Sequence, residues 1–85
     1  MPPTIHLNVP TNVVLGQYVT ATVTADVDFK WSRIVGHVAG GGKKEGATHR
    51  VRATRAPVSS MRAVILDETG ELGRSSAVLL SVTKP

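Results

Sequence analysis

Residues 61–82 read Met61-Arg-Ala-Val-Ile-Leu-Asp67-Glu-Thr-Gly70-Glu-Leu-Gly73-Arg-Ser-Ser-Ala-Val-Leu-Leu-Ser-Val82, and this stretch decides the fold. Two runs of apolar residues that favour β-strands flank a polar segment containing Asp67, Gly70 and Gly73. The pattern is typical of a β-hairpin, because aspartate favours turns and glycine adopts the positive φ angles that a reversing chain often needs. The stretch therefore predicts two paired strands joined by a turn.

The rest of the chain shows the same signature in shorter segments. Apolar and polar residues alternate, or nearly so, in four segments, residues 4–9, 18–25, 29–34 and 47–55, and residues 13–15 suit an edge strand. No window of ten or more residues has the apolar spacing of an amphipathic helix. Six or seven short strands separated by turn signals predict an all-β sandwich or barrel. Residues 36–46 contain five glycines and are expected to form a flexible loop.

Alternation also predicts which side chains form the core. Phe29 and Trp31 lie two residues apart, on one face of their strand, and both are placed in the core. In residues 47–55, His49 and Val51 face one way and the intervening arginines face the other. In the final hairpin, residues 63, 65, 78, 80 and 82 are assigned to the core.

Length and composition bound the remaining possibilities. The 85 residues, with no cysteine, predict a single domain over residues 1–85 whose core is thin and has no disulfide. The start of the chain lacks the basic end and apolar stretch of a signal peptide, and no run approaches a membrane span. We therefore expect a protein made in the cytoplasm without a signal peptide, with no membrane partner.

The residues along nearly the whole chain resemble an immunoglobulin-like domain, of the cysteine-free kind found in bacterial surface proteins and tailed-phage virions. Residues 16–23 resemble strand B of that family, and Phe29-Lys-Trp31 resembles strand C with its tryptophan. Residues 61–67 resemble strand F and residues 78–82 strand G, although Met61 and Ala63 stand where the family would have tyrosine and cysteine. The resemblance implies an immunoglobulin-like antiparallel β-sandwich of about seven strands, with the non-enzymatic, decorating role of such domains in capsids, tails or fibres.

The residue types that carry catalysis or bind metals do not form a recognisable motif. The three histidines have no metal-ligand spacing and no cysteine beside them, so no metal or other cofactor is expected. The serines lack the context of an activated nucleophile, and the carboxylates lie in predicted turns. Asp26 and Asp28 could contribute to a calcium site, but two carboxylates are too few to predict one. From the sequence we therefore expect a protein that is not an enzyme.

Apolar excess on the final hairpin is the most informative functional feature. If alternate residues fill the core, then Val64, Leu66, Ala77 and Leu79 point outward, and Ile34 joins them from the strand C region. An antiparallel sheet normally exposes a polar face to water, so these five residues predict a surface that a partner covers. The alternative is that the glycine-rich segment or the N-terminal segment covers them within the monomer.

Four cations are candidates for electrostatic contacts: Lys43, Lys44, Arg50 and Arg52. The net charge of +4 suits an acidic partner, or simply keeps the protein soluble. Only three aromatic residues are present, and this composition argues against a nucleic-acid partner.

These features together predict a non-enzymatic structural module that docks through the outer face of strands C, F and G. The expected partner is a capsid or other virion protein, or a second copy of the chain, and the expected location is the virion. The alternatives are a carbohydrate- or cell-surface-binding module, which needs exposed aromatic residues, and a small basic nucleic-acid-binding protein.

Overall fold

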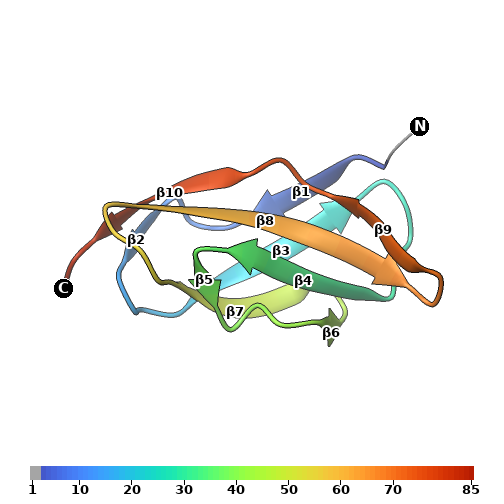
Figure 1. Ribbon diagram of the computed structural model, residues 1–85, viewed down its shortest axis with the longest axis horizontal. Coiled ribbons are helices and arrows are strands. Elements are labelled where there is room, and N and C mark those ends of the chain that lie inside the picture. The colour runs from blue at the N-terminus through green and yellow to red at the C-terminus, as the bar shows by residue number, and fades with distance from the viewer. Residues whose placement is uncertain (1–2) are drawn as a thin grey trace.

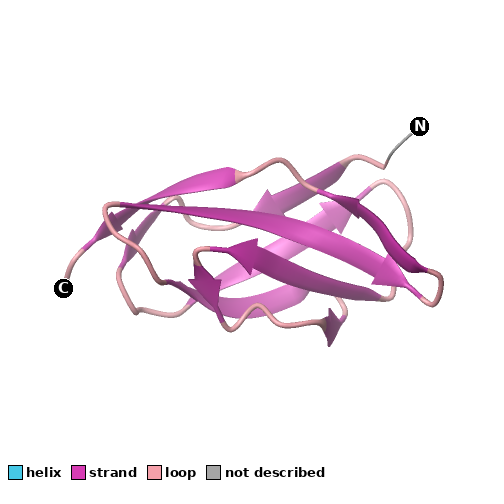
Figure 2. Cartoon of the chain, viewed as in Figure 1, coloured by secondary structure: helices cyan, strands magenta, loops and turns pink. Residues whose placement is uncertain are grey.

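A computed structural model describes residues 3–85, which form strands and loops only (Figures 1 and 2). These residues contain no helix that is long and apolar enough to cross a membrane. The strands are β1 (Ile5–Asn8), β2 (Asn12–Val14), β3 (Val19–Ala25), β4 (Trp31–Gly36), β5 (Val38–Ala39), β6 (Lys44–Glu45), β7 (Thr48–Ala53), β8 (Val58–Asp67), β9 (Gly70–Arg74) and β10 (Val78–Thr83).

Two sheets pack face to face. One has the strand order β1-β3-β7-β5, and the other has the order β2-β10-β8-β4-β6 with β9 also paired to β8. In Figure 1 the first sheet lies behind the second. All pairs are antiparallel except β2 with β10. The expected all-β sandwich is confirmed, with ten strands in residues 3–85 rather than seven, and its topology is compatible with an immunoglobulin-like arrangement.

The final hairpin is present, but its second strand is divided. Strand β8 turns at Asp67–Gly70 into β9, which pairs with the second half of β8, and β10 then pairs with the first half. Gly70 has a φ of 116°, as the turn requires. Gly73 does not have a positive φ angle, and a Cβ at this position would lie only 3.0 Å from the Ile5 side chain. Gly73 therefore serves close packing rather than chain reversal.

The core lies between the sheets, and alternation predicts most of it correctly. The buried apolar residues of the central strands include Ala21, Val23, Val51, Met61, Ala63, Ile65, Leu80 and Val82. Threonines of β3 and arginines of β7 face away from this core, as expected for strands with one solvated face.

Strand β4 has the opposite orientation from the predicted one. Trp31 is only partly buried, on the outer face, whereas Ser32 and Ile34 point into the interior, and Ile34 is 4% exposed. The placements of Trp31 in the core and of Ile34 on the outer face are therefore wrong. The chain bends at Lys30, immediately before β4 begins, so the alternation does not continue from Phe29, which does pack against the core.

The segment expected to be a flexible loop, residues 36–46, carries β5 and β6. Its centre packs on β4, because Gly41 is buried and its carbonyl accepts a hydrogen bond of 2.8 Å from the Ile34 N–H. A Cβ on Gly41 would lie 2.7 Å from the Cβ of Ile34, so glycine permits this approach. The segment therefore joins the two sheets instead of projecting from them.

Candidate functional site

The outer face of the six-stranded sheet, where a docking surface is predicted, has two distinct ends. β8 runs through both, paired first with β10 and then with β9, while β4 lies along its other edge. We call the end at Trp31, Val64 and Leu66 the covered end. We call the end at Val58 and Leu79 the open end.

At the covered end, Val64 points outward and is nevertheless fully buried, outside the core cluster between the sheets. Its cross-strand neighbours are Arg33 on β4 and Arg74 on β9. Long cationic side chains lay their apolar stems over such a neighbour while their charged ends reach water. Glu71 fixes Arg74 with two hydrogen bonds of 3.0 and 3.1 Å, which lower the pKa of the Glu71 carboxyl. The chain itself therefore covers Val64.

Trp31 and Leu66 are paired across the same end and are both partly buried. The Nζ atoms of Lys30 and Lys43 lie 4.7 and 4.5 Å from the centre of the Trp31 ring. Lys30 also forms an ion pair of 3.1 Å with Glu68. The tryptophan ring therefore contacts cations of its own chain.

The five predicted contact residues do not form one surface. Ile34 lies in the core, Val64 is covered, and Leu66 is partly buried. Ala77 and Leu79 are exposed, as predicted. The open question of whether the apolar face is covered within the monomer thus has a different answer at each end. At the covered end, Arg33 and Arg74 flank Val64, and Lys43 of the glycine-rich segment lies over Trp31. At the open end, Leu79 is uncovered.

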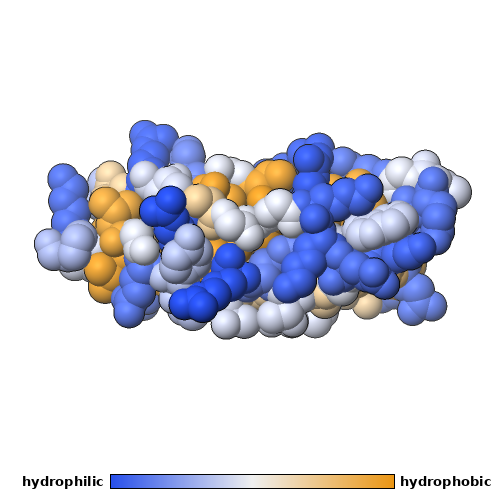
Figure 3. All heavy atoms as spheres, turned by 90° about the horizontal axis from the view of Figure 1, so that it is seen from below, coloured by the Kyte–Doolittle hydropathy of each residue, from blue (hydrophilic) through white to orange (hydrophobic). Residues whose placement is uncertain are grey.

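At the open end, Leu79 is 65% exposed and Val58 is 46% exposed. Leu79 lies opposite Ser60 and Val58 lies opposite Ser81, which places both apolar side chains on the outer face. They border a shallow cavity of about 260 Å³ lined by His37, Arg55, Pro57, Val58, Ser60 and Leu79. Figure 3 shows hydrophilic residues over much of the lower side of the molecule and hydrophobic residues toward the end where β2 and β10 lie.

The polar groups of this cavity are held by backbone contacts. The His37 N–H donates to the Ser60 carbonyl at 2.8 Å, and the Ser60 N–H donates to His37 Nδ1 at 3.1 Å. The Ser59 hydroxyl accepts from the Arg55 N–H at 3.2 Å and donates to the Arg55 carbonyl at 2.6 Å. These bonds place Arg55 Nη1 3.3 Å from His37 Nε2.

Sequence reasoning missed His37, Arg55, Pro57, Val58 and Ser60 as members of this site. Pro57, Ser59 and Ser60 are residue types that favour turns, whereas β8 already begins at Val58. The available signal was the alternation of Ala63 and Ile65, because its extension back along the chain places Val58 and Ser60 on the outer face. No local pattern could have brought Arg55 and His37 together.

The predicted electrostatic residues separate into two groups. Arg50 and Arg52 lie on the outer face of the four-stranded sheet, with guanidinium carbons 5.1 and 5.8 Å from the centre of the Tyr18 ring. Lys43 and Lys44 lie at the edge of the other sheet, by Trp31 and β4. The structure therefore does not combine the four cations into one patch.

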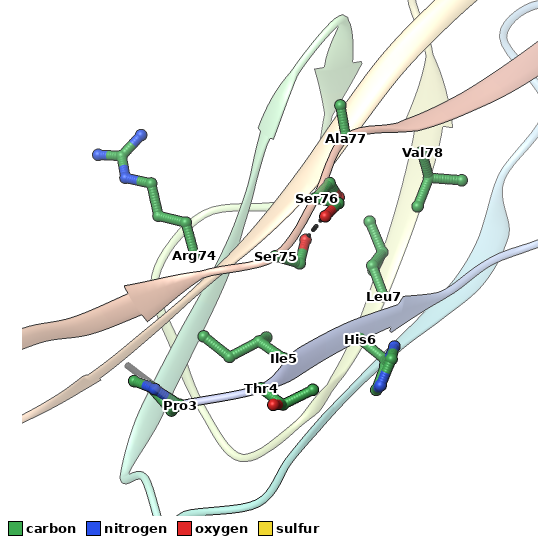
Figure 4. Close-up of a pocket in the computed structure, with 10 residues that line it drawn as sticks. All are labelled: Pro3, Thr4, Ile5, His6, Leu7, Arg74, Ser75, Ser76, Ala77 and Val78. Carbon is green, nitrogen blue, oxygen red and sulfur yellow. Dashed lines mark hydrogen bonds between the residues drawn. The ribbon is translucent and has the colours of Figure 1, made fainter. Parts of the chain in front are cut away.

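A larger cavity, about 310 Å³, lies at the side of the sandwich between β1 and residues 74–78 (Figure 4). Ile5 and Leu7 point toward it, whereas the Arg74 side chain extends away from it. The Ser75 hydroxyl accepts from the Ala63 N–H at 2.8 Å and donates to the Ser76 carbonyl at 3.0 Å. These bonds use the donor of the Ser75 hydroxyl within the chain. We therefore interpret the cavity as a gap between β1 and residues 74–78 at the side of the sandwich rather than as a ligand site.

Ser32 and His49 form a buried pair between the sheets, with Ser32 Oγ 2.7 Å from His49 Nε2. The Ser32 proton goes to the Gly46 carbonyl at 2.6 Å, so the His49 Nε2–H must be the donor to the serine. This is the reverse of the arrangement that activates a serine nucleophile, where the imidazole accepts the hydroxyl proton. The pair therefore connects β4 and β7 structurally.

Burial lowers the pKa of His49, and the charge of Lys44 lowers it further. The unfolded chain then binds a proton that the folded chain does not, so stability should fall as the pH drops below about 6.5. The slope should reach up to about 1.4 kcal/mol per pH unit. Urea unfolding between neutral pH and about pH 5 would measure it. His49→Gln should flatten the profile, and the exposed control His6→Gln should not; equal slopes for both variants would contradict the assignment.

Neither the arrangement of possible metal ligands nor the comparison with known proteins identifies a function for the chain. Within residues 3–85, no group of three or more His, Cys, Asp or Glu side chains is arranged to hold a metal ion. Neither protein-family models nor curated proteins match the sequence.

Proposed function

We propose that this chain is a non-enzymatic binding module that attaches to another protein through the open end. The observation that carries the proposal is the contrast between Leu79 and Val64. Both point outward from the same sheet, but Val64 is covered by arginines of its own chain while Leu79 is 65% exposed next to Val58. Uncovered apolar side chains around a shallow cavity favour burial against a partner.

The resemblance to cysteine-free immunoglobulin-like domains of tailed phages supports a capsid or other virion protein as the partner. Such a module would be attached to the virion as an accessory or decoration protein. Association of two copies through the same open end is the alternative protein contact, and it would use the same side chains.

The two other function classes gain less support. Carbohydrate modules stack sugars on free aromatic faces, whereas cations of the chain lie over the rings of Trp31 and Tyr18. A nucleic-acid-binding surface needs a continuous basic patch. Here the candidate cations are divided between the two sheets.

Sedimentation of a lysate of the natural source tests the proposal, with the chain detected by an antibody. The wild-type chain should sediment with particles much heavier than itself. Leu79→Thr and Val58→Thr should shift it toward the top of the gradient, because each removes apolar contact while threonine keeps the preference for a strand. Purified Leu79→Thr should melt within a few degrees of the wild type, since Leu79 is exposed.

Arg50→Gln combined with Arg52→Gln is the matched control on the opposite sheet and should leave sedimentation unchanged. If the wild-type chain remains with small proteins, or if Leu79→Thr still sediments with the particles, the proposed docking is wrong. Loss of sedimentation only in the double arginine variant would move the contact to the four-stranded sheet.

A further inference from the structure

The hydrogen bonds of His37 determine the tautomer of its neutral ring. Both backbone groups of Ser60 point toward His37: its carbonyl accepts from the His37 N–H, and its N–H donates to Nδ1. A nitrogen that accepts a hydrogen bond cannot carry a proton. The neutral imidazole must therefore have its proton on Nε2, and this Nε2–H donor belongs to a residue that lines the cavity and lies beside Arg55.

Arg55 Nη1, which can only donate, lies 3.3 Å from this Nε2. Two donors cannot bond each other. Moving the proton to Nδ1 does not resolve the conflict, because Nδ1–H would then face the Ser60 N–H. In every protonation state of His37, at least one of its contacts with Ser60 N–H and Arg55 Nη1 therefore places two donors against each other. Arg55 is exposed, so an acceptor from another molecule can approach it and His37 together.

An acceptor placed between the two groups would satisfy both. None of the six residues that line the cavity is acidic, so the lining supplies no carboxylate to Arg55. A carboxylate oxygen suits the position, because its hydrogen bonds to a guanidinium are charge-assisted and stronger than those of a neutral group. The net charge of +4 adds a general attraction for an acidic partner.

We propose that the open end recognises a carboxylate of the partner protein that lies beside an apolar side chain. The carboxylate accepts from His37 Nε2–H and from Arg55, while the neighbouring apolar side chain packs against Leu79 and Val58. This inference rests on the proposed function and specifies the chemistry of the partner. It makes the open end a site for an acidic, apolar peptide segment rather than a purely hydrophobic patch.

Two peptide probes of nearly the same shape, one with a carboxylate and one with a neutral amide, test the inference on the ¹⁵N-labelled protein. N-acetyl-leucyl-glutamyl amide should shift the amide signals of Ser60 and Leu79 saturably at neutral pH and about 0.15 M salt. N-acetyl-leucyl-glutaminyl amide, which has the same shape without the charge, should bind at least about tenfold more weakly. The ring nitrogen shifts of His37 should show the Nε2–H form in the free protein.

Three variants assign the effect to the donors. Arg55→Gln should weaken the glutamyl probe about tenfold and leave the glutaminyl probe unchanged. Arg62→Gln removes the same charge from an exposed position on the same sheet face, and should change binding less than about twofold. His37→Asn keeps an acceptor for the Ser60 N–H and removes the Nε2 donor, so it should fold normally and bind the glutamyl probe more weakly.

Equal binding of the two probes, or an Nδ1–H form of His37, would overturn the carboxylate site. If equal binding occurs while Leu79→Thr still abolishes sedimentation with the particles, the proposed docking survives and only its acidic specificity is wrong. If neither probe shifts Leu79 and Leu79→Thr sediments like the wild type, the open end is not a binding surface at all.

Discussion

Gly36→Ala should lose a large part of the stability of this protein, about 3–5 kcal/mol of the roughly 4–13 kcal/mol expected for a chain of this length. Gly36 ends β4 with a φ of 119°, a conformation that residues with a Cβ rarely adopt. A Cβ there would also lie 2.1 Å from the Ser60 carbonyl oxygen, an atom of the central strand β8. Neither the backbone angle nor the collision can be relieved without separating β4 from β8.

The matched control is Gly42→Ala, further along the same connection. A Cβ on Gly42 would have no atom within 4 Å, and Gly42 does not have a positive φ angle. Its replacement should be neutral, or stabilising by less than about 1 kcal/mol, through the unfolded state. Urea unfolding of both variants measures the difference; similar midpoints would mean that the chain can leave β4 by another route.

The central hairpin strand could be predicted from the sequence because its signals are local. In β8, the inward positions Ala63 and Ile65 alternate with outward ones, and Gly70 supplies the turn. The apolar residues of β10, Leu80 and Val82, follow the same rule. Such alternation holds wherever a strand continues without a bend.

The orientation of β4 could not be predicted in this way. Trp31 and Ile34 exchange their expected faces because a bend at Lys30 resets the alternation, and nothing at this position marks the bend. The interior position instead holds Ser32, a polar residue that is tolerated because His49 and the Gly46 carbonyl satisfy its hydroxyl. That partnership exists only after β4 and β7 have packed together.

The open end is likewise a product of the tertiary fold. His37 follows β4, Arg55 follows β7, and Leu79 belongs to β10. They line one cavity because β8 lies between β4 and β10, with Ser60 bonded to His37 on one side and opposite Leu79 on the other. The sequence shows that Leu79 points outward, but not which neighbours leave it uncovered.

Val64→Lys and Leu79→Lys should differ widely in their effects on stability, although both replace an outward apolar side chain of the same sheet. At Val64 the new charge would be buried between Arg33 and Arg74, where it has no counter-ion of its own and faces like charges on both adjacent strands. An uncompensated buried charge costs about 3–5 kcal/mol. Leu79 is 65% exposed, so lysine there should change the free energy of unfolding by less than about 0.5 kcal/mol.

Chemical denaturation of the two variants compares these positions directly. A folded, stable Val64→Lys would show that Arg33 and Arg74 move aside readily, and that the apolar face can open into one continuous surface including Leu66. In that case a partner could contact the whole face, and the open end would be only part of the interface. With the expected result, Arg33 and Arg74 hold their places over Val64, and the exposed apolar part of this sheet face is limited to the neighbourhood of Leu79 and Val58.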